Sequence, residues 1–300
     1  MTYSDIATKG LVLLGCGKMG SAMLEGWLKG GLPAASVYVI DPKPSEWLRA
    51  TGAHLNTELP EAPAIVIVAV KPQMMGAALP TLQAMGGGST LVISVAAGTP
   101  IKHFEAVLGA DTPIVRAMPN TPAAVAQGIT AIVGNKATTA THLNAAQALL
   151  EAVGTVVRLK SENQIDAVTG VSGSGPAYVF HLIECLAAAG EAQGLAPELA
   201  MQLAKATVAG AGALAIASSE TPSQLRVTVP SPNGTTQAGL DELMDSDRGL
   251  PPPNRRTVAP PTNRPKESPR HSRSRAAPRP ARGLPPRRSP RSPLSPPSPP

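Results

Sequence analysis

Cysteine is scarce in this sequence. Cys16 and Cys185 are the two cysteines among 300 residues, and neither belongs to a CxxC motif. This number and spacing exclude a disulfide framework and a thiolate zinc site. The five histidines are scattered through the chain without the spacing of metal ligands. We therefore expect no bound metal, and unpaired cysteines are typical of a reducing, cytoplasmic compartment.

Long hydrophobic runs are missing as well. The most apolar stretch, Thr207–Ala217, has eleven residues. A membrane-spanning helix needs about twenty. The apolar run Leu11–Leu14 before Cys16 is also shorter than the roughly 7–15 apolar residues of an export signal. The sequence thus predicts no membrane partner.

Aromatic and acidic side chains are nearly absent from one part of the chain. Residues 251–300 contain no Phe, Trp or Tyr and a single acid, Glu267, together with twelve basic side chains and seventeen of the 33 prolines. Such a segment buries too little apolar surface to offset its chain entropy, so we predict a disordered tail. Residues 1–250 carry 14 basic and 19 acidic side chains. Nucleic acid is therefore not expected as a partner, except through the tail.

Catalytic arrangements that work without a cofactor are also missing. The residue pattern contains no recognisable Ser/His/Asp set or pair of carboxylates. The segment Gly170–Ser174, "GVSGS", lacks the final glycine of the GxSxG nucleophile elbow and follows no predicted strand. A reaction catalysed by this chain is therefore expected to depend on a cofactor.

A glycine-rich motif near the N-terminus indicates such a cofactor. Gly15, Gly17 and Gly20 form GxGxxG after the apolar run Gly10–Gly15 and before a helical pattern. The first glycine permits a tight turn, the second lets the backbone approach a diphosphate, and the third lets the helix pack closely on the strand. A second predicted strand, Ser36–Asp41, ends in an acid. The whole unit is typical of a dinucleotide-binding domain.

The end of this second strand bears on which cofactor is bound. The carboxylate of Asp41 can accept a hydrogen bond from the ribose 2′-hydroxyl of NADH. Lys43, two residues later, can instead contact the 2′-phosphate of NADPH. The two residues favour opposite answers, so both cofactors stay open at this point.

Five further apolar segments predict the rest of a sheet. They are continuous rather than alternating, which is typical of parallel strands buried on both faces. Three of them end in the loops VKPQ, SVAAGTP and RAMPNTP, which are expected to form the wall of a cleft. The predicted strands are Ala64–Val70, Thr90–Val95, Pro113–Met118, Gly128–Val133 and Gly154–Leu159.

The second half of the chain reads as helices rich in alanine, leucine and glycine, from residue 164 to residue 219. Their apolar surface predicts contact with another subunit. Two helix N-termini offer N–H groups to an anion. The first begins at Pro176, with the hydroxyls of Ser172 and Ser174 expected to cap it, and the second lies within Ser231–Met244.

Taken in order, the motifs GCGKMG, AVKPQ, SVAAG, RAMPNTP, TGVSGSGPAYVF and SPNGTTQAGL resemble those of the pyrroline-5-carboxylate reductases, across about residues 10–250. Members of this family reduce a cyclic imine to L-proline with NADPH or NADH. The resemblance implies an α/β fold with an N-terminal Rossmann dinucleotide-binding domain over residues 1–160. An all-α substrate and dimerisation domain over residues 161–250 would follow, and then the disordered tail over residues 251–300. It also implies self-association as a dimer or a ring of dimers.

The resemblance further implies roles for individual residues. Ser174 and Thr236 are expected to act in catalysis, with the Thr236 hydroxyl near the ring nitrogen of the substrate. The substrate carboxylate is expected at Ser231, Gly234, Thr235 and Thr236. Together with Asp41 and Lys43, the residues expected around NADPH or NADH are Gly15, Gly17, Lys18, Met19, Gly20, Lys71, Pro72, Met118, Pro119 and Asn120.

Two departures from the family pattern concern the C-terminal part. Pro230 stands where the family usually has threonine, and it removes a backbone donor beside the substrate loop. Pro251–Pro253 replace apolar and alanine positions of the family's last helix, and we expect them to prevent a helix there. We hypothesise that the tail after about Glu267, together with the proline substitutions, reflects a reading-frame error or a degenerate gene.

These departures keep other functions open. One is a catalytically impaired NAD(P)-binding protein whose basic tail binds nucleic acid. Another is a different imine reductase or a β-hydroxyacid reductase of the same architecture. The latter would need a lysine as acid, and Lys205 is the one lysine between Glu162 and Leu250.

Overall fold

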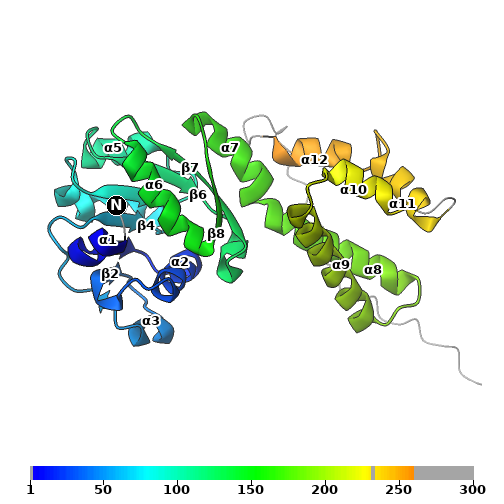
Figure 1. Cartoon of the computed structure of the whole chain (residues 1–300), viewed down its shortest axis with the longest axis horizontal. Helices are drawn as coiled ribbons and strands as arrows, with labels where there is room; N and C mark the ends of the chain where they lie inside the picture. The colour runs from blue at the N-terminus through cyan, green and yellow to red at the C-terminus, as the bar shows by residue number, and fades with distance from the viewer. Residues whose placement is uncertain (1–2, 231–233, 260–300) are drawn as a thin grey trace, which may run out of the picture. The chain divides into compact units, whose positions relative to one another are not determined.

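The computed structural model describes residues 3–230 and 234–259, which contain an α/β region and the helices that follow it (Figure 1). The strands are β1 Leu11–Leu14, β2 Val37–Ile40, β3 His54–Leu55, β4 Ile65–Val68, β5 Leu91–Ser94, β6 Ile114–Met118, β7 Gly128–Gly134 and β8 Gly154–Arg158. The helices of the α/β region are α1 Tyr3–Lys9, α2 Lys18–Lys29, α3 Glu46–Ala50, α4 Met75–Ala78, α5 Ile101–Leu108 and α6 Ala140–Leu150. The later helices are α7 Ile165–Val168, α8 Gly175–Ala192, α9 Pro197–Ala217, α10 Pro222–Thr228, α11 Thr235–Met244 and α12 Pro251–Val258.

The strands form a single sheet in the order β3-β2-β1-β4-β5-β6-β7-β8. Leu11 of β1 is in parallel register with Val37 of β2 on one side and Ile65 of β4 on the other. The strand order therefore reverses at β1, and the loop after β1 opens where ligands bind in such sheets. All seven predicted strands are confirmed, with shifts of one or two residues at their ends. The sequence missed β3, because two residues are too few to give a pattern.

The last two strands depart from the fully parallel sheet that the sequence predicts. β7 pairs with β6 in the antiparallel direction, and β8 is parallel to β7. The link from β6 to β7 contains only a 3-10 turn, Thr121–Val125, and no crossover helix. Without a crossover the chain must return beside β6 in the opposite direction. The RAMPNTP segment is therefore a tight connection between two neighbouring strands.

Apolar packing holds α2 firmly against the sheet. Trp27 of α2 is fully buried, and its indole N–H donates a hydrogen bond of 2.8 Å to the carbonyl of Leu149 in α6. A Cβ on Gly26 would lie 2.9 Å from the carbonyl oxygen of Ala152, so the helix approaches its neighbour closely. Truncating a buried Trp to Ala costs about 3–5 kcal/mol. The N-terminus of α2, which follows the glycine motif, thus has a rigid support.

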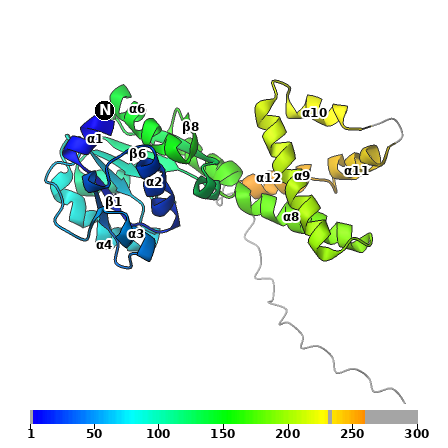
Figure 2. The same cartoon turned by 60° about the horizontal axis from the view of Figure 1, so that its bottom comes forward.

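The helices after the sheet leave much apolar surface uncovered. α8 and α9 lie side by side in both views (Figure 2) and pack through small residues, with Ala187 and Ala200 buried between them. By contrast, Phe180 and Leu214 are each 58% exposed and Ile216 is 85% exposed. Exposed apolar side chains in this density are typical of a protein–protein contact. This agrees with the expectation of a partner subunit.

One helix, α9, is longer and more apolar than the sequence analysis allowed. It has 21 residues and a window of mean hydropathy 1.4, so by length and composition it could cross a membrane. The count of uninterrupted apolar residues missed it, because Lys205 interrupts the run. An apolar helix that packs against another subunit has the same composition, and the exposed side chains above place α9 on such a surface.

The residues directly after Leu250 form a helix, which corrects a prediction. Pro251, Pro252 and Pro253 occupy the first turn of α12. The first four N–H groups of a helix have no partner within it, so prolines at its start remove no hydrogen bond. The predicted disorder is therefore wrong for Pro251–Val258. The rest of the predicted tail, residues 260–300, lies outside the described residues.

Candidate active site

The glycine loop between β1 and α2 has the geometry that its motif predicts. Gly15 has φ of +90°, and a Cβ there would lie 3.0 Å from the carbonyl of Ala69. A Cβ on Gly20 would collide with the carbonyl oxygen of Gly15. Around Gly17, in contrast, a Cβ would meet nothing within 4 Å. The outer glycines thus serve packing, and the middle one leaves space for a ligand.

The start of α2 offers donors to that ligand. The cap residue Gly17 has no side chain, and α2 receives no side-chain cap. Its first N–H groups therefore point outward with the positive end of the helix dipole, an arrangement that suits the diphosphate of a dinucleotide. Lys18 is exposed at the first position of the helix and adds a positive charge. The residues present fit NAD(P)H, as predicted.

The acid at the end of β2 faces the same loop. Oδ2 of Asp41 accepts a hydrogen bond of 2.7 Å from the backbone N–H of Cys16, and Oδ1 accepts one of 2.7 Å from the N–H of Lys43. Asn56, in the left-handed region with φ of 52°, exchanges two hydrogen bonds of 2.9 Å with the backbone of Asp41. The carboxylate is therefore fixed beside the glycine loop, where a ribose hydroxyl is expected.

The thiol beside this loop is not set up as a nucleophile. Cys16 is 7% exposed. Burial raises the pKa of its thiol, the hydrogen bond with Ser21 lowers it, and the nearby Asp41 carboxylate raises it further. A buried thiol of raised pKa stays protonated at neutral pH, so this residue serves packing.

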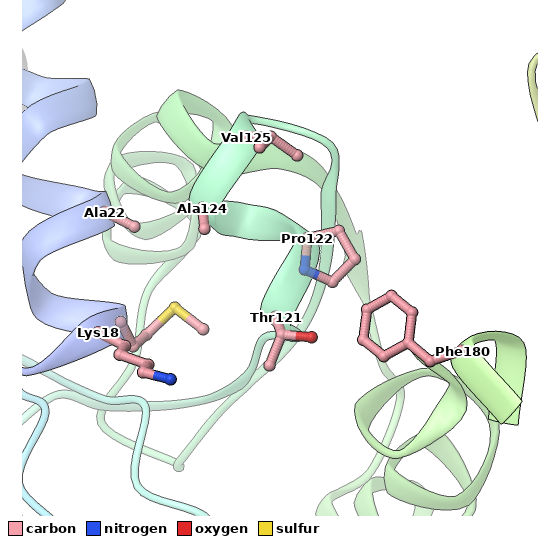
Figure 3. A pocket seen from close by; sticks show the side chains of 8 residues that line it. Lys18, Ala22, Thr121, Pro122, Ala124, Val125 and Phe180 are labelled. Carbon is pink, nitrogen blue, oxygen red and sulfur yellow. The ribbon is translucent and has the colours of Figure 1, made fainter. Parts of the chain in front are cut away.

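A pocket of about 630 Å³ opens beside the glycine loop. In Figure 3 Lys18 and Phe180 stand on opposite sides of it, with Thr121 and Pro122 in between. The lining is mainly apolar, and it consists of Lys18, Met19, Ala22, Thr121, Pro122, Ala124, Val125 and Phe180. The pocket thus joins the start of α2, the turn after β6 and the first turns of α8.

Sequence reasoning found only part of this lining. Lys18 and Met19 were predicted as cofactor residues. Thr121 and Pro122 were not named as site residues, but they belong to RAMPNTP, which was predicted to form part of the wall of a cleft. Phe180 was missed because a single aromatic residue in an apolar helix gives no signal of its own. Lys71 and Pro72, which follow β4 and are exposed, do not line the pocket.

β6 and the loop after it are each bonded by one side chain to the segment that follows β8. Arg116, 8% exposed, donates a hydrogen bond of 2.7 Å from Nη1 to Oε1 of Glu162, which also accepts one of 2.8 Å from the N–H of Ile101. Nδ2 of Asn120 donates a hydrogen bond of 3.1 Å to the carbonyl of Ser172. Sequence reasoning missed Arg116, and it assigned Asn120 to the cofactor.

The serine-rich stretch differs from the predicted capped helix start. Thr169–Gly173 form a π-turn that joins α7 to α8, and the N–H of Ser174 donates a hydrogen bond of 2.8 Å to the carbonyl of Thr169. The Ser172 hydroxyl donates to the carbonyl of Val168, and the Ser174 side chain caps nothing. Ser174 forms a bend between the π-turn and α8, so helical residues precede α8 where the prediction had a free, capped helix start.

The predicted substrate residues lie apart from the pocket within one chain. Gly234 is the cap of α11, and Thr235 and Thr236 form its first two positions. Ser231 lies outside the described residues. The residues that line the pocket include none from α11, and Ser174 is not among them either.

Comparisons with known proteins agree with this geometry. The pyrroline-5-carboxylate reductase dimerisation family matches residues 162–251, and the family described as NADP oxidoreductase, coenzyme F420-dependent, matches residues 10–98. The pyrroline-5-carboxylate reductase of Pseudomonas aeruginosa is 39% identical over 241 residues, which cover 78% of this chain and 88% of that protein. That of Synechocystis is 45% identical over 188 residues, which cover 63% and 69%.

Solved structures give the same result. A pyrroline-5-carboxylate reductase from Coxiella burnetii aligns with a TM-score of 0.79 at 31% identity, over 84% of this chain and 95% of its own. The pyrroline carboxylate reductase of Plasmodium falciparum, solved with NADP bound, aligns with a TM-score of 0.73 at 28% identity, over 84% and 95%. Sequence and fold agree over most of both chains, and this chain belongs to the pyrroline-5-carboxylate reductase family.

Proposed function

We propose that this protein reduces the cyclic imine pyrroline-5-carboxylate to L-proline with hydride from NADH or NADPH. One observation carries the proposal: the start of α2, directly after the glycine loop, and the turn after β6 meet at one pocket, in a chain that also holds the segments TGVSGSGPAYVF and SPNGTTQAGL. Lys205 of α9, the lysine that a β-hydroxyacid reductase would need as acid, is exposed and is not among the residues that line the pocket within one chain.

The chemistry required fits the residues of the pocket. When bound, reduced nicotinamide supplies a hydride to the imine carbon, while a proton adds to the ring nitrogen. A protonated imine already accepts hydride well, so the chain mainly has to align two rings. Lys18 is the one charged residue among those that line the pocket, and the apolar remainder keeps water away from the transfer. No strong general base is needed.

We assign the completion of the site to a second copy of the chain. Support comes from the matched dimerisation family, from the exposed apolar side chains on α8 and α9, and from the separation of α11 from the pocket within one chain. In such a dimer, Gly234, Thr235 and Thr236 of one copy would receive the substrate carboxylate beside the other copy's nicotinamide. The Thr236 hydroxyl would hold the proton at the ring nitrogen, and the Ser174 hydroxyl, free of capping, would contact the substrate.

The purified protein provides the test. We expect oxidation of NADH or NADPH, followed by absorbance at the nicotinamide band, only when pyrroline-5-carboxylate is added, with proline as the product. A folded sample that oxidises neither cofactor with this substrate would overturn the proposal. RNA binding that weakens with salt and disappears on deletion of residues 260–300 would instead support the alternative of a nucleic-acid-binding tail.

A further inference from the structure

The carbonyl of Ser172, in the π-turn just before α8, lacks a helical partner. In an α-helix the carbonyl of Ser172 would accept from the N–H of residue 176, four positions later. Residue 176 is proline, which has no N–H. The N–H of Ala177 is used elsewhere, because it donates to the carbonyl of Ser174 at 3.0 Å. The Ser172 carbonyl therefore needs a donor from outside the helix.

Asn120 supplies that donor. Its Nδ2 lies 3.1 Å from the Ser172 carbonyl, and its Oδ1 accepts a hydrogen bond of 3.0 Å from the N–H of Ile129 in β7. A carbonyl on one side and an N–H on the other leave one orientation for the amide. Asn120 is 9% exposed, and both ends of its amide are bonded within the protein, which leaves one N–H and one oxygen lone pair for any further contact.

The same place shows a second close contact. A Cβ on Gly173 would lie 2.6 Å from Cε of Met118, so the end of β6 lies directly against the π-turn. Ser174 follows Gly173, and Thr121 follows Asn120 at the wall of the pocket. One amide therefore joins the wall of the cofactor pocket to the segment that carries Ser174.

We propose that Asn120 is a positioning residue: by holding the Ser172 carbonyl in place of the missing N–H of Pro176, it sets where Ser174 stands relative to the cofactor pocket. This inference rests on the proposed function. It differs from the sequence prediction, in which Asn120 itself contacts the cofactor. Since misplacement by about 1 Å reduces turnover about 100-fold, loss of this bond should reduce kcat rather than cofactor affinity.

Asn120→Asp is the informative variant. One carboxylate oxygen can still accept from Ile129, while the other faces the Ser172 carbonyl oxygen and repels it. We expect kcat to fall by about 10- to 100-fold with nearly unchanged affinity for NADH. Asn135→Asp is the matched control, because Asn135 also bridges an N–H, that of Ile114, and a carbonyl, that of Thr112, but within the sheet region. It should lower stability without a selective loss of kcat.

Pro176→Ala provides a rescue. It restores an N–H four residues after Ser172, so the Asn120→Asp change should cost less in the Pro176→Ala background than in the original chain. Equal losses of kcat in both backgrounds, or a collapse of NADH affinity in Asn120→Asp, would overturn the inference. If Asn120→Asp does not fold, Asn120→Ser replaces it in this comparison of kcat. The serine side chain is too short to bridge the Ser172 carbonyl and the Ile129 N–H.

Hydrogen exchange separates this inference from the proposed function. Asn120→Asp should speed exchange of the backbone amides of residues 171–175, and Asn135→Asp should not, whether or not pyrroline-5-carboxylate is reduced. Unchanged exchange in this segment would sink the positioning role. If Asn120→Asp speeds exchange in this segment but the original chain does not reduce pyrroline-5-carboxylate, the proposed function is wrong. The structural link between Asn120 and the π-turn would still hold.

Discussion

Oδ2 of Asp41 lies 2.7 Å from the backbone nitrogen of Cys16, so the end of β2 is bonded to the glycine loop at the end of β1. Oδ1 accepts a second hydrogen bond from the N–H of Lys43. Held from two directions, the carboxylate keeps a fixed place at the edge of the cofactor site. Its negative charge therefore has a fixed place where we expect the adenosine ribose to bind.

This arrangement predicts a preference for NADH. A ribose 2′-hydroxyl can donate to Asp41, whereas a 2′-phosphate about 4 Å away would be repelled by ~1 kcal/mol with full water screening and by ~4 kcal/mol near a protein surface. Asp41→Asn should therefore raise kcat/KM for NADPH relative to NADH by about tenfold or more. The control Glu46→Gln removes an exposed acid from α3 and should leave the ratio unchanged. If the original chain already prefers NADPH, Lys43 rather than Asp41 determines the cofactor preference.

Two glycines of the loop should fail in different ways. Gly20→Ala places a Cβ against the Gly15 carbonyl oxygen. We expect the free energy of unfolding to fall by about 1–3 kcal/mol, as for other overpacked sites. Gly17→Ala meets no protein atom within 4 Å, so stability should be nearly unchanged while NADH affinity falls. Urea unfolding measures the stability, and fluorescence titration measures the NADH affinity. If Gly20→Ala and Gly17→Ala lose the same affinity and have the same stability, the division of roles between the two glycines is wrong.

The sequence predicted those parts of the fold that depend on local pattern. GxGxxG between a buried strand and a helix needs little beyond its own thirty residues to fix the turn: Gly15 and Gly20 make the predicted close contacts, and the space beside Gly17 is open. The continuous apolar segments likewise predicted each long strand. These features follow from backbone sterics and burial, which neighbouring residues determine.

The parts that failed depend on distant contacts. The direction of β7 is set by the short link after Asn120, and apolar composition carries no direction. The π-turn before Ser174 accepts a hydrogen bond from the Asn120 side chain, which lies about fifty residues earlier, so the local pattern predicted a capped helix start instead. Thr236 is separated from the pocket within one chain, and its role depends on an assembly that a single sequence does not display.

Thr236→Ala tests the substrate end of the site. Thr236 is half-buried at the second position of α11. If its hydroxyl holds the proton at the ring nitrogen, turnover should fall by about 100-fold, within the range of a lost proton-transfer group, while NADH affinity stays intact. Thr228→Ala is the control, because the Thr228 hydroxyl donates to the Leu225 carbonyl within α10, the helix before α11. Loss of NADH affinity in Thr236→Ala would mean that the substrate end has been misplaced.

The buried thiol predicts a pH dependence of stability. Because burial raises the pKa of Cys16 in the folded state, its contribution is fully present below the unfolded pKa of about 8.5 and is lost as pH rises through the higher folded value. In a Cys185→Ser background, the difference in unfolding free energy between the Cys16 chain and Cys16→Ala should therefore shrink above about pH 9. The native thiol should also react with iodoacetamide far more slowly than in urea at pH 8. A constant difference up to pH 10.5 would contradict the raised pKa.

Two truncations distinguish α12 from the residues that follow it. A Cβ on Gly170 would lie 2.6 Å from the carbonyl oxygen of Val258, so the end of α12 rests directly on the π-turn that precedes Ser174. Removing residues 260–300 leaves this contact in place, and we expect unchanged kcat and melting temperature. Removing residues 251–300 takes away α12 as well, and the melting temperature should drop by ~2–4 °C for each kcal/mol of lost packing, together with a lower kcat. Gly170→Ala should resemble the longer deletion, because the added methyl group pushes α12 away. If instead the deletion of residues 260–300 already abolishes turnover, residues after Ala259 are needed for activity. The stabilisation of the π-turn would then not come from α12 alone.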